Sequence, residues 1–88
     1  MQCRIEVRRE KGLLVVRLAG RLGEAQVPDL LEACAGSGEP RLELDDLISA
    51  DALGVDALSR IEQRGGKLVG LPEYLRLQLN DLSRYRKF

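Results

Sequence analysis

The sequence contains no histidine, and its only cysteines are Cys3 and Cys34. A zinc site made of four Cys and His ligands therefore cannot be assembled within one chain. The lack of histidine also removes the commonest general base that would activate a nucleophile. We predict that the protein is not an enzyme, that it holds no metal and no cofactor, and that both cysteines are free thiols in the core.

Aromatic residues are equally scarce. Tyr74, Tyr85 and Phe88 are the only three, and all lie late in the chain. They cannot provide the stacking platform on which single-stranded nucleic acids bind. The sequence also lacks a run of about 18 apolar residues and a signal-peptide stretch at its N-terminus. These absences predict a cytoplasmic protein that is not embedded in a membrane and does not bind nucleic acid.

The charges balance, with 14 basic and 14 acidic residues among 88, but they are unevenly distributed. Residues 1–21 carry six basic and two acidic side chains, whereas residues 22–64 carry three basic and ten acidic ones. A chain that is 44% hydrophobic and 32% charged is expected to fold, and its length suits one domain. We expect a single domain over residues 1–88, with residues 84–88 as a loose charged tail.

The N-terminal part has the pattern of a β-hairpin. Apolar and polar residues alternate from Cys3 to Arg8, which is typical of a half-buried strand. A more continuous apolar run follows from Leu13 to Leu18. The intervening segment, residues 10–12, contains Gly12 and is predicted to form a turn.

The middle of the chain alternates between helix and strand patterns. Val27, Leu30, Leu31, Cys34 and Ala35 have the spacing of one helical face. Glycine and proline in residues 36–40 end that helix. Leu42 and Leu44 alternate with charged residues as in a short strand, and residues 45–50 are expected to form a loop.

A second helix is predicted from Asp51, which has the position of an N-cap, to Gly65. Its apolar stripe contains Leu53, Ala57 and Ile61, with Val55 and Leu58 beside them, while Ser59 is expected at the surface. A strand over residues 67–71 and a last helix containing Tyr74, Leu75, Leu79 and Leu82 complete the order β-β-α-β-α-β-α. This order predicts a small α/β domain, a mixed sheet of about four strands with about three helices packed on it.

Residues 41–58 resemble the STAS domain, the family of anti-sigma factor antagonists. Glu43 stands where that family usually has a strand aspartate, Asp51 matches its turn aspartate, Gly54 its turn glycine and Leu58 its helix leucine. The similarity extends to residues 15–22 and 65–71. The resemblance implies the α/β fold expected above and a role in protein–protein contact without catalysis.

The chain departs from the family at the position that carries regulation. In the family's partner-switching members a kinase phosphorylates the serine just before the glycine, whereas Leu53 stands there in this sequence and Ala52 precedes it. A phosphate would add about −1.5 to −2 charges at the helix start, which leucine cannot do. Ser49 is the nearest hydroxyl and is a weak candidate phosphoacceptor. We therefore predict a constitutive interaction module in place of a phosphorylation switch.

The resemblance places the partner-binding surface at the start of this helix. The predicted partner-binding residues are Asp51, Leu53, Gly54, Val55 and Leu58. For Leu53, packing in the core and exposure to a partner both remain open at this point. The partner implied by the family is an anti-sigma factor that is also a kinase, within bacterial-type signalling.

Two alternatives and one question about assembly stay open. The chain could be an accessory STAS subunit that docks on the ATPase of a lipid transporter, which is also an interaction role. It could instead sense a small ligand such as a nucleotide, although residues 43–58 carry only acidic charges. Homodimer formation is neither favoured nor excluded by the sequence.

Overall fold

The computed structural model describes residues 3–36 and 38–85. The elements are β1 (Arg4–Glu10), β2 (Leu13–Leu22), the short 3-10 helix η1 (Glu24–Gln26), α1 (Val27–Cys34), β3 (Arg41–Ala50), α2 (Ala52–Gln63), β4 (Lys67–Val69) and α3 (Glu73–Tyr85). This is the predicted order of strands and helices, with one short 3-10 helix added. The predicted α/β class is confirmed.

The four strands form one mixed sheet in the order β1-β2-β3-β4. β1 and β2 are antiparallel, while β3 lies parallel to β2, and β4 parallel to β3. The hairpin turn between β1 and β2 is the pair Lys11 and Gly12, with φ of 52° and 81°. Two consecutive positive φ angles are the mark of the type I′ turn, whose twist matches that of the paired strands.

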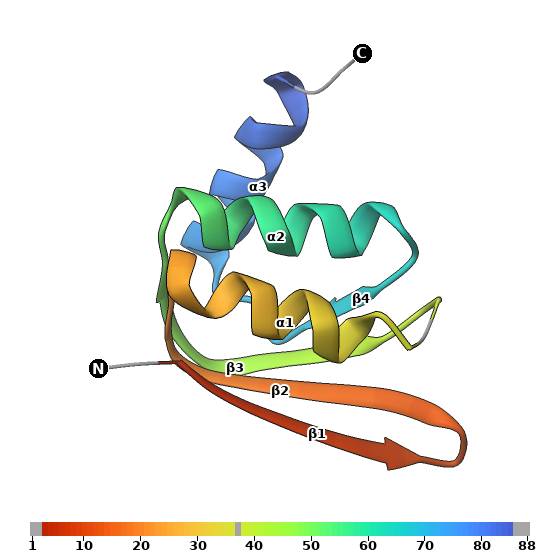
Figure 1. Cartoon of the computed structure of the whole chain (residues 1–88). Helices are drawn as coiled ribbons and strands as arrows, with labels where there is room; N and C mark the ends of the chain where they lie inside the picture. Colours follow the sequence, from red (N-terminus) through yellow and green to blue (C-terminus); the bar gives the residue numbers. More distant parts are fainter. Residues whose placement is uncertain (1–2, 37, 86–88) are drawn as a thin grey trace.

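The helices cover one face of the sheet. α1 and α2 lie over that face, and α3 packs beside α2 (Figure 1). Leu14, Val16 and Leu18 of β2 are directed into this core and are 3% exposed or less, and Leu42 and Leu44 of β3 are fully buried beside them. The alternate residues of β2 face the opposite side, over which no helix lies in the part of the chain that the structure describes.

β3 is longer than the sequence indicated. Residues 45–50, expected to form a loop, continue the strand to Ala50 and pair with the end of β2, Gly20 with Leu47 and Leu22 with Ala50. The register shifts twice, between Arg17 and Ala19 and between Gly20 and Arg21 of β2, and at each place β3 contains one residue more than its partner. These two shifts interrupt the alternation of apolar and polar residues, which is why residues 45–50 did not show a strand pattern.

The C-terminal elements also differ in length from the prediction. β4 ends at Val69, before Gly70, which has a φ of 72°. α3 spans Glu73–Tyr85, so Tyr85 and its neighbour Arg84, expected in a loose tail, have helical backbone. The remaining residues of that expected tail, 86–88, lie outside the described residues.

Candidate functional site

The candidate site is the junction at which β3 ends and α2 begins. Asp51 lies between them with extended backbone, φ −79° and ψ −178°, and its Oδ1 accepts a hydrogen bond from the Gly54 N–H at 2.8 Å. This is the N-cap predicted from the sequence. A carboxylate at this position satisfies a free N–H of the first turn and interacts favourably with the positive end of the helix dipole.

Asp51 also ties α2 to a distant part of the chain. Its Oδ2 accepts a hydrogen bond from the Glu24 N–H at 2.9 Å, and its backbone N–H donates to the Leu22 carbonyl at 3.0 Å. One residue therefore holds the start of α2 against the end of β2 and the beginning of η1. Sequence patterns do not predict this contact, because the two segments are 27 residues apart.

Gly54 lets the two segments approach closely. A Cβ placed on Gly54 would lie 2.7 Å from the Leu22 carbonyl oxygen and 3.0 Å from Leu22 Cγ. Real Cβ atoms do not come so close to a carbonyl oxygen, so a larger residue would push α2 away from β2. The glycine is therefore required here by packing between segments.

The predicted partner-binding residues divide into exposed and buried ones. Leu53 is 48% exposed and Asp51 is also exposed, so both can be reached by a partner. Gly54 is buried, Val55 is 6% exposed and Leu58 is fully buried. Of the five predicted positions, two therefore have accessible side chains, and the other three pack α2 against the rest of the fold.

Two further expectations on α2 are corrected by its burial pattern. Leu53 does not join Ala57 and Ile61 in the buried stripe, so the core alternative left open by the sequence does not hold. Ser59, expected at the surface, is 2% exposed, and its hydroxyl accepts a hydrogen bond from Gln63 Nε2 at 3.2 Å. Packing against both α1 and α3 widens the buried side of α2 beyond the stripe that faces the sheet.

Ser49, the weak phosphoacceptor candidate, lies in β3 and is paired with Arg21 of β2. It is half-buried in the strand instead of standing in a loop. A kinase binds its target residue in an accessible segment, and a paired strand residue would first have to leave the sheet. The strand therefore does not favour phosphorylation at this position.

A hollow of about 350 Å³ lies beside the junction, between the start of α2 and α3. Its lining residues are Ala50, Asp51, Ala52, Val55, Gln78, Asp81 and Leu82. The charged groups in this lining are the carboxylates of Asp51 and Asp81. Phosphate groups would be repelled by them, so the hollow does not favour the nucleotide alternative.

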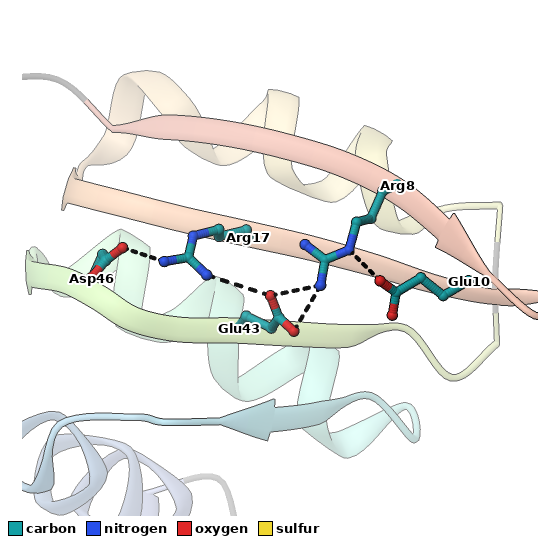
Figure 2. Close-up of polar contacts among 5 residues, drawn as sticks. All are labelled: Arg8, Glu10, Arg17, Glu43 and Asp46. Atoms are coloured by element: carbon teal, nitrogen blue, oxygen red, sulfur yellow. Dashed lines mark hydrogen bonds and ion pairs between the residues drawn. The ribbon is translucent and has the colours of Figure 1, made fainter.

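The helix-free face of the sheet carries a chain of ion pairs that runs across three strands (Figure 2). Glu43 of β3 accepts hydrogen bonds from Arg8 of β1 at 3.0 and 3.1 Å, and lies 3.6 Å from Arg17 of β2. Arg8 also contacts Glu10 at 2.8 Å, and Arg17 contacts Asp46. The family's strand aspartate position, occupied here by Glu43, thus connects β1, β2 and β3.

The ion pairs raise the pKa values of the two arginines further above neutral pH. Hydrogen bonds to Glu10, and then to Glu43, raise the pKa of Arg8, and the hydrogen bond to Asp46 raises that of Arg17. Pairs this exposed to solvent add little stability each. The aliphatic parts of the arginine side chains also cover apolar surface. Val15 lies on this face opposite Arg8 and is only 1% exposed.

The two cysteines are free in the structure. Burial raises the pKa of the Cys34 thiol to about 11, and burial also raises the pKa of Cys3. Both thiols are therefore protonated at neutral pH and are poor nucleophiles. Over residues 3–36 and 38–85 there is no cluster of three or more His, Cys, Asp or Glu side chains suited to a metal ion, nor any helix long and apolar enough to cross a membrane.

The comparisons with known proteins give a result for structure only. No family model matches the sequence, and no curated protein matches it significantly. An anti-sigma factor antagonist from Mycobacterium paratuberculosis superposes with a TM-score of 0.74 at 15% identity, covering 99% of this chain and 83% of that one.

Two further solved structures of anti-sigma factor antagonists also superpose on this chain. The anti-sigma factor antagonist SpoIIAA in its unphosphorylated form has a TM-score of 0.66 at 14% identity, covering 97% of this chain and 100% of that one. An anti-sigma factor antagonist STAS domain from Rhodobacter sphaeroides has a TM-score of 0.58 at 20% identity, covering 77% and 86%. The chain therefore has the fold of the STAS domains. At these identities the similarity establishes the fold alone.

The double role of Asp51 leads to a prediction about stability. We expect Asp51→Ala to lower the free energy of unfolding by about 1–3 kcal/mol, because two backbone N–H groups lose a charged acceptor. Asp51→Asn keeps one amide oxygen and should lose less. Urea denaturation followed by circular dichroism measures both. Equal stability of Asp51→Ala and the wild type would contradict the role assigned to the two hydrogen bonds.

Proposed function

We propose that the chain is a non-catalytic protein-interaction module of the anti-sigma factor antagonist type, whose docking does not depend on serine phosphorylation. The partner surface is the start of α2, with Leu53 as its apolar contact and Asp51 beside it. The observation that carries the proposal is the exposure of Leu53, 48%, on a helix turn that is held in place by the hydrogen bonds of Asp51 and the close packing of Gly54. An exposed leucine on a rigid turn can enter a pocket at little entropic cost.

The geometry around Leu53 supports a preformed contact surface. Gly54, the next residue, is buried against Leu22, and Asp51 fixes the first turn of α2 by two hydrogen bonds. The backbone that carries Leu53 therefore has little freedom to change on binding. The partner chemistry that fits is an apolar pocket flanked by a basic group, which would pair with the carboxylate of Asp51.

The constitutive character of the docking is proposed from the resemblance together with the burial of the nearby hydroxyl groups. Leu53 occupies the position of the serine that the family phosphorylates. Of the two serines closest along the chain, Ser49 is half-buried in β3 and Ser59 is 2% exposed on α2. Neither stands at the exposed start of the helix. Mass spectrometry of the protein purified from its native cells would contradict constitutive docking if it found stoichiometric phosphate within residues 49–59.

The test of the contact surface is Leu53→Asp in affinity purification from native lysate, read by quantitative mass spectrometry. We expect this variant to lose the partner that the wild type retains by about 100-fold or more, because an exposed anchor at an interface centre commonly contributes that much. If the partner retained by the wild-type protein has an ATP-binding kinase domain, the anti-sigma factor hypothesis is supported. If the partner is a transporter ATPase, the accessory-subunit alternative is supported.

The matched control is Leu77→Asp on α3. Leu77 is 59% exposed, so the substitution makes the same chemical change at an exposed leucine away from the start of α2. We expect Leu77→Asp to retain the partner. If Leu53→Asp binds as well as the wild type, or if both variants lose the partner equally, Leu53 is not the specific contact and the proposed surface is wrong.

A further inference from the structure

β1 is an edge strand, and no described element covers its outer side. It is the first strand in the sheet order, and its only strand partner among the described residues is β2. With seven residues, Arg4–Glu10, it is long for an unprotected edge. A row of unpaired backbone N–H and C=O groups on such a strand is a template for adding another strand.

The backbone groups that face this free edge follow from the hairpin. Antiparallel pairs alternate between residues that exchange hydrogen bonds and residues that do not, and a two-residue turn is closed by a hydrogen-bonded pair. Glu10 and Leu13 flank the turn and form that pair. Counting back from Glu10, the even-numbered residues of β1 bond to β2. Ile5, Val7 and Arg9 therefore direct their N–H and C=O groups outward.

Residues of opposite charge lie at equal distances on the two sides of Val7 in β1. On the helix-free face the order is Arg4, Glu6, Arg8 and Glu10. If a second β1 lies antiparallel with Val7 opposite Val7, each Arg4 faces a Glu10 and each Glu6 faces an Arg8. Every one of these cross-strand pairs joins opposite charges, which stabilises neighbouring strands.

Neighbouring registers of the same pairing are disfavoured. Only the outward N–H and C=O groups of Ile5, Val7 and Arg9 can bond to the second strand. The two-fold axis of the pairing can therefore pass only through a residue of β1, and not between two residues. A centre at residue 6 places Arg4 opposite Arg8 and Glu6 opposite itself. A centre at residue 8 places Glu6 opposite Glu10 and Arg8 opposite itself. Like charges directly opposite each other destabilise a sheet, so the sequence selects the register centred on Val7.

The other face of β1 is also complementary to a second copy. Cys3, Ile5 and Val7 line a groove of about 600 Å³ between β1 and α1, whose opposite wall carries Asp29 and Glu32. Val7 is 52% exposed there. In the register centred on Val7, the Arg9 of the second copy lies opposite Ile5, at this groove.

The three charged groups concerned, those of Arg9, Asp29 and Glu32, form no ion pair with another side chain that the structure describes. No salt bridge joins Arg9, Asp29 or Glu32 to any other residue in the described part of the chain. The basic side chain of one copy would therefore meet the acidic wall of the other, twice in a symmetric pair. Both faces of β1 thus fit the same partner in the same register.

We propose that two copies of this chain associate through their β1 edges, antiparallel and centred on Val7, to form one continuous eight-stranded sheet around a two-fold axis. The doubled strand number follows from the four-stranded sheet of each copy. The surface is separate from the start of α2, so a dimer of this kind leaves Leu53 and Asp51 of both copies exposed. The dimer proposal is therefore independent of the proposed function, and each can be tested without the other.

The test uses two charge variants of the full chain. Glu6→Lys/Glu10→Lys makes the helix-free face of β1 entirely basic, and Arg4→Glu/Arg8→Glu makes it entirely acidic. We expect each variant alone to associate about 100-fold more weakly than the wild type, because four favourable pairs become repulsive. An equimolar mixture should restore association. Sedimentation equilibrium from about 1 μM to about 1 mM at low salt covers micromolar affinities.

The matched control is Arg41→Glu/Lys67→Glu. These basic residues lie on the same face of the sheet, in β3 and β4, away from the β1 edge. The control makes the same charge change as the acidic variant and should associate like the wild type. Circular dichroism establishes that each variant is folded before its mass is compared.

Amide hydrogen exchange gives a second readout that does not depend on any variant. The N–H groups of Ile5, Val7 and Arg9 should become more protected as the wild-type concentration rises, while those of Glu6 and Arg8, already bonded to β2, should not change. A wild-type protein that stays at 9.8 kDa up to about 1 mM overturns the proposal. So does a mixture of the two charge variants that associates no better than either variant alone.

Discussion

Replacing Gly54 with valine is expected to lower the free energy of unfolding by about 3 kcal/mol or more. The first added atom, Cβ, would lie 2.7 Å from the Leu22 carbonyl oxygen, which belongs to the backbone and cannot move as a side chain would. The first turn of α2 would have to shift away from β2, and Asp51 would then lose its hydrogen bond to the Glu24 N–H. Thermal unfolding should show a fall in Tm of more than about 10 °C.

The sign of the effect of Gly54→Ala separates packing from helix propensity. In an open helix position, alanine stabilises relative to glycine by about 1 kcal/mol. Here we expect alanine to destabilise, because the clash exceeds that gain. Gly38→Ala is the control, since a Cβ there meets nothing within 4 Å. A more stable Gly54→Ala protein would show that the close approach to Leu22 does not constrain this position.

Local signals accounted for much of the fold. The hairpin was predicted from an alternating run and a more continuous apolar run separated by a turn that contains Gly12, and the structure has a type I′ turn at Lys11 and Gly12. The N-cap role of Asp51 was predicted because a carboxylate before an apolar stripe is a short-range pattern, and the Gly54 N–H contact confirms it. Features set within a few residues are those that a sequence can reveal.

The direction of side chains on α2 could not be read in the same way. At 100° per residue, Leu53 lies about 140° around the helix from the fully buried Leu58, so it points away from the sheet. Ser59 lies about 100° from Leu58 and is buried, because α2 has helices on its flanks as well as the sheet beneath it. The width of the buried side is a property of the assembled fold, so neither Leu53 nor Ser59 was placed by periodicity alone.

Contacts between segments far apart in the chain could not be predicted from the sequence either, because they also depend on the assembled fold. The hydrogen bond from the Glu24 N–H to Asp51 and the ion pairs of Glu43 with Arg8 and Arg17 require the strand order of the finished sheet. The two register shifts in β3 have a comparable effect, because each extra residue exchanges the two faces of the strand beyond it. The charge symmetry of β1, by contrast, is visible in the sequence, but it acquires meaning only once β1 is known to be an edge strand.

Leu58→Ala is expected to be the other strongly destabilising change, with a loss of about 2–5 kcal/mol. Leu58 is fully buried within the core between α2 and the sheet, and truncation would leave a cavity there. Equilibrium denaturation in urea measures the loss, with an unchanged slope if the native fold is kept. Leu53→Ala, at an exposed position on the same helix, should change stability by less than about 0.5 kcal/mol.

The two leucines should therefore separate stability from binding. Folded Leu58→Ala protein, compared at a temperature well below its midpoint, should retain the partner, since Leu58 is inaccessible to it. Leu53→Asp should lose the partner while its unfolding midpoint stays close to that of the wild type. The opposite pattern, binding lost through Leu58 in the folded state and kept without Leu53, would mean that α2 turns or opens when it docks. In that case the buried residues of the helix, and not its exposed first turn, would form the contact.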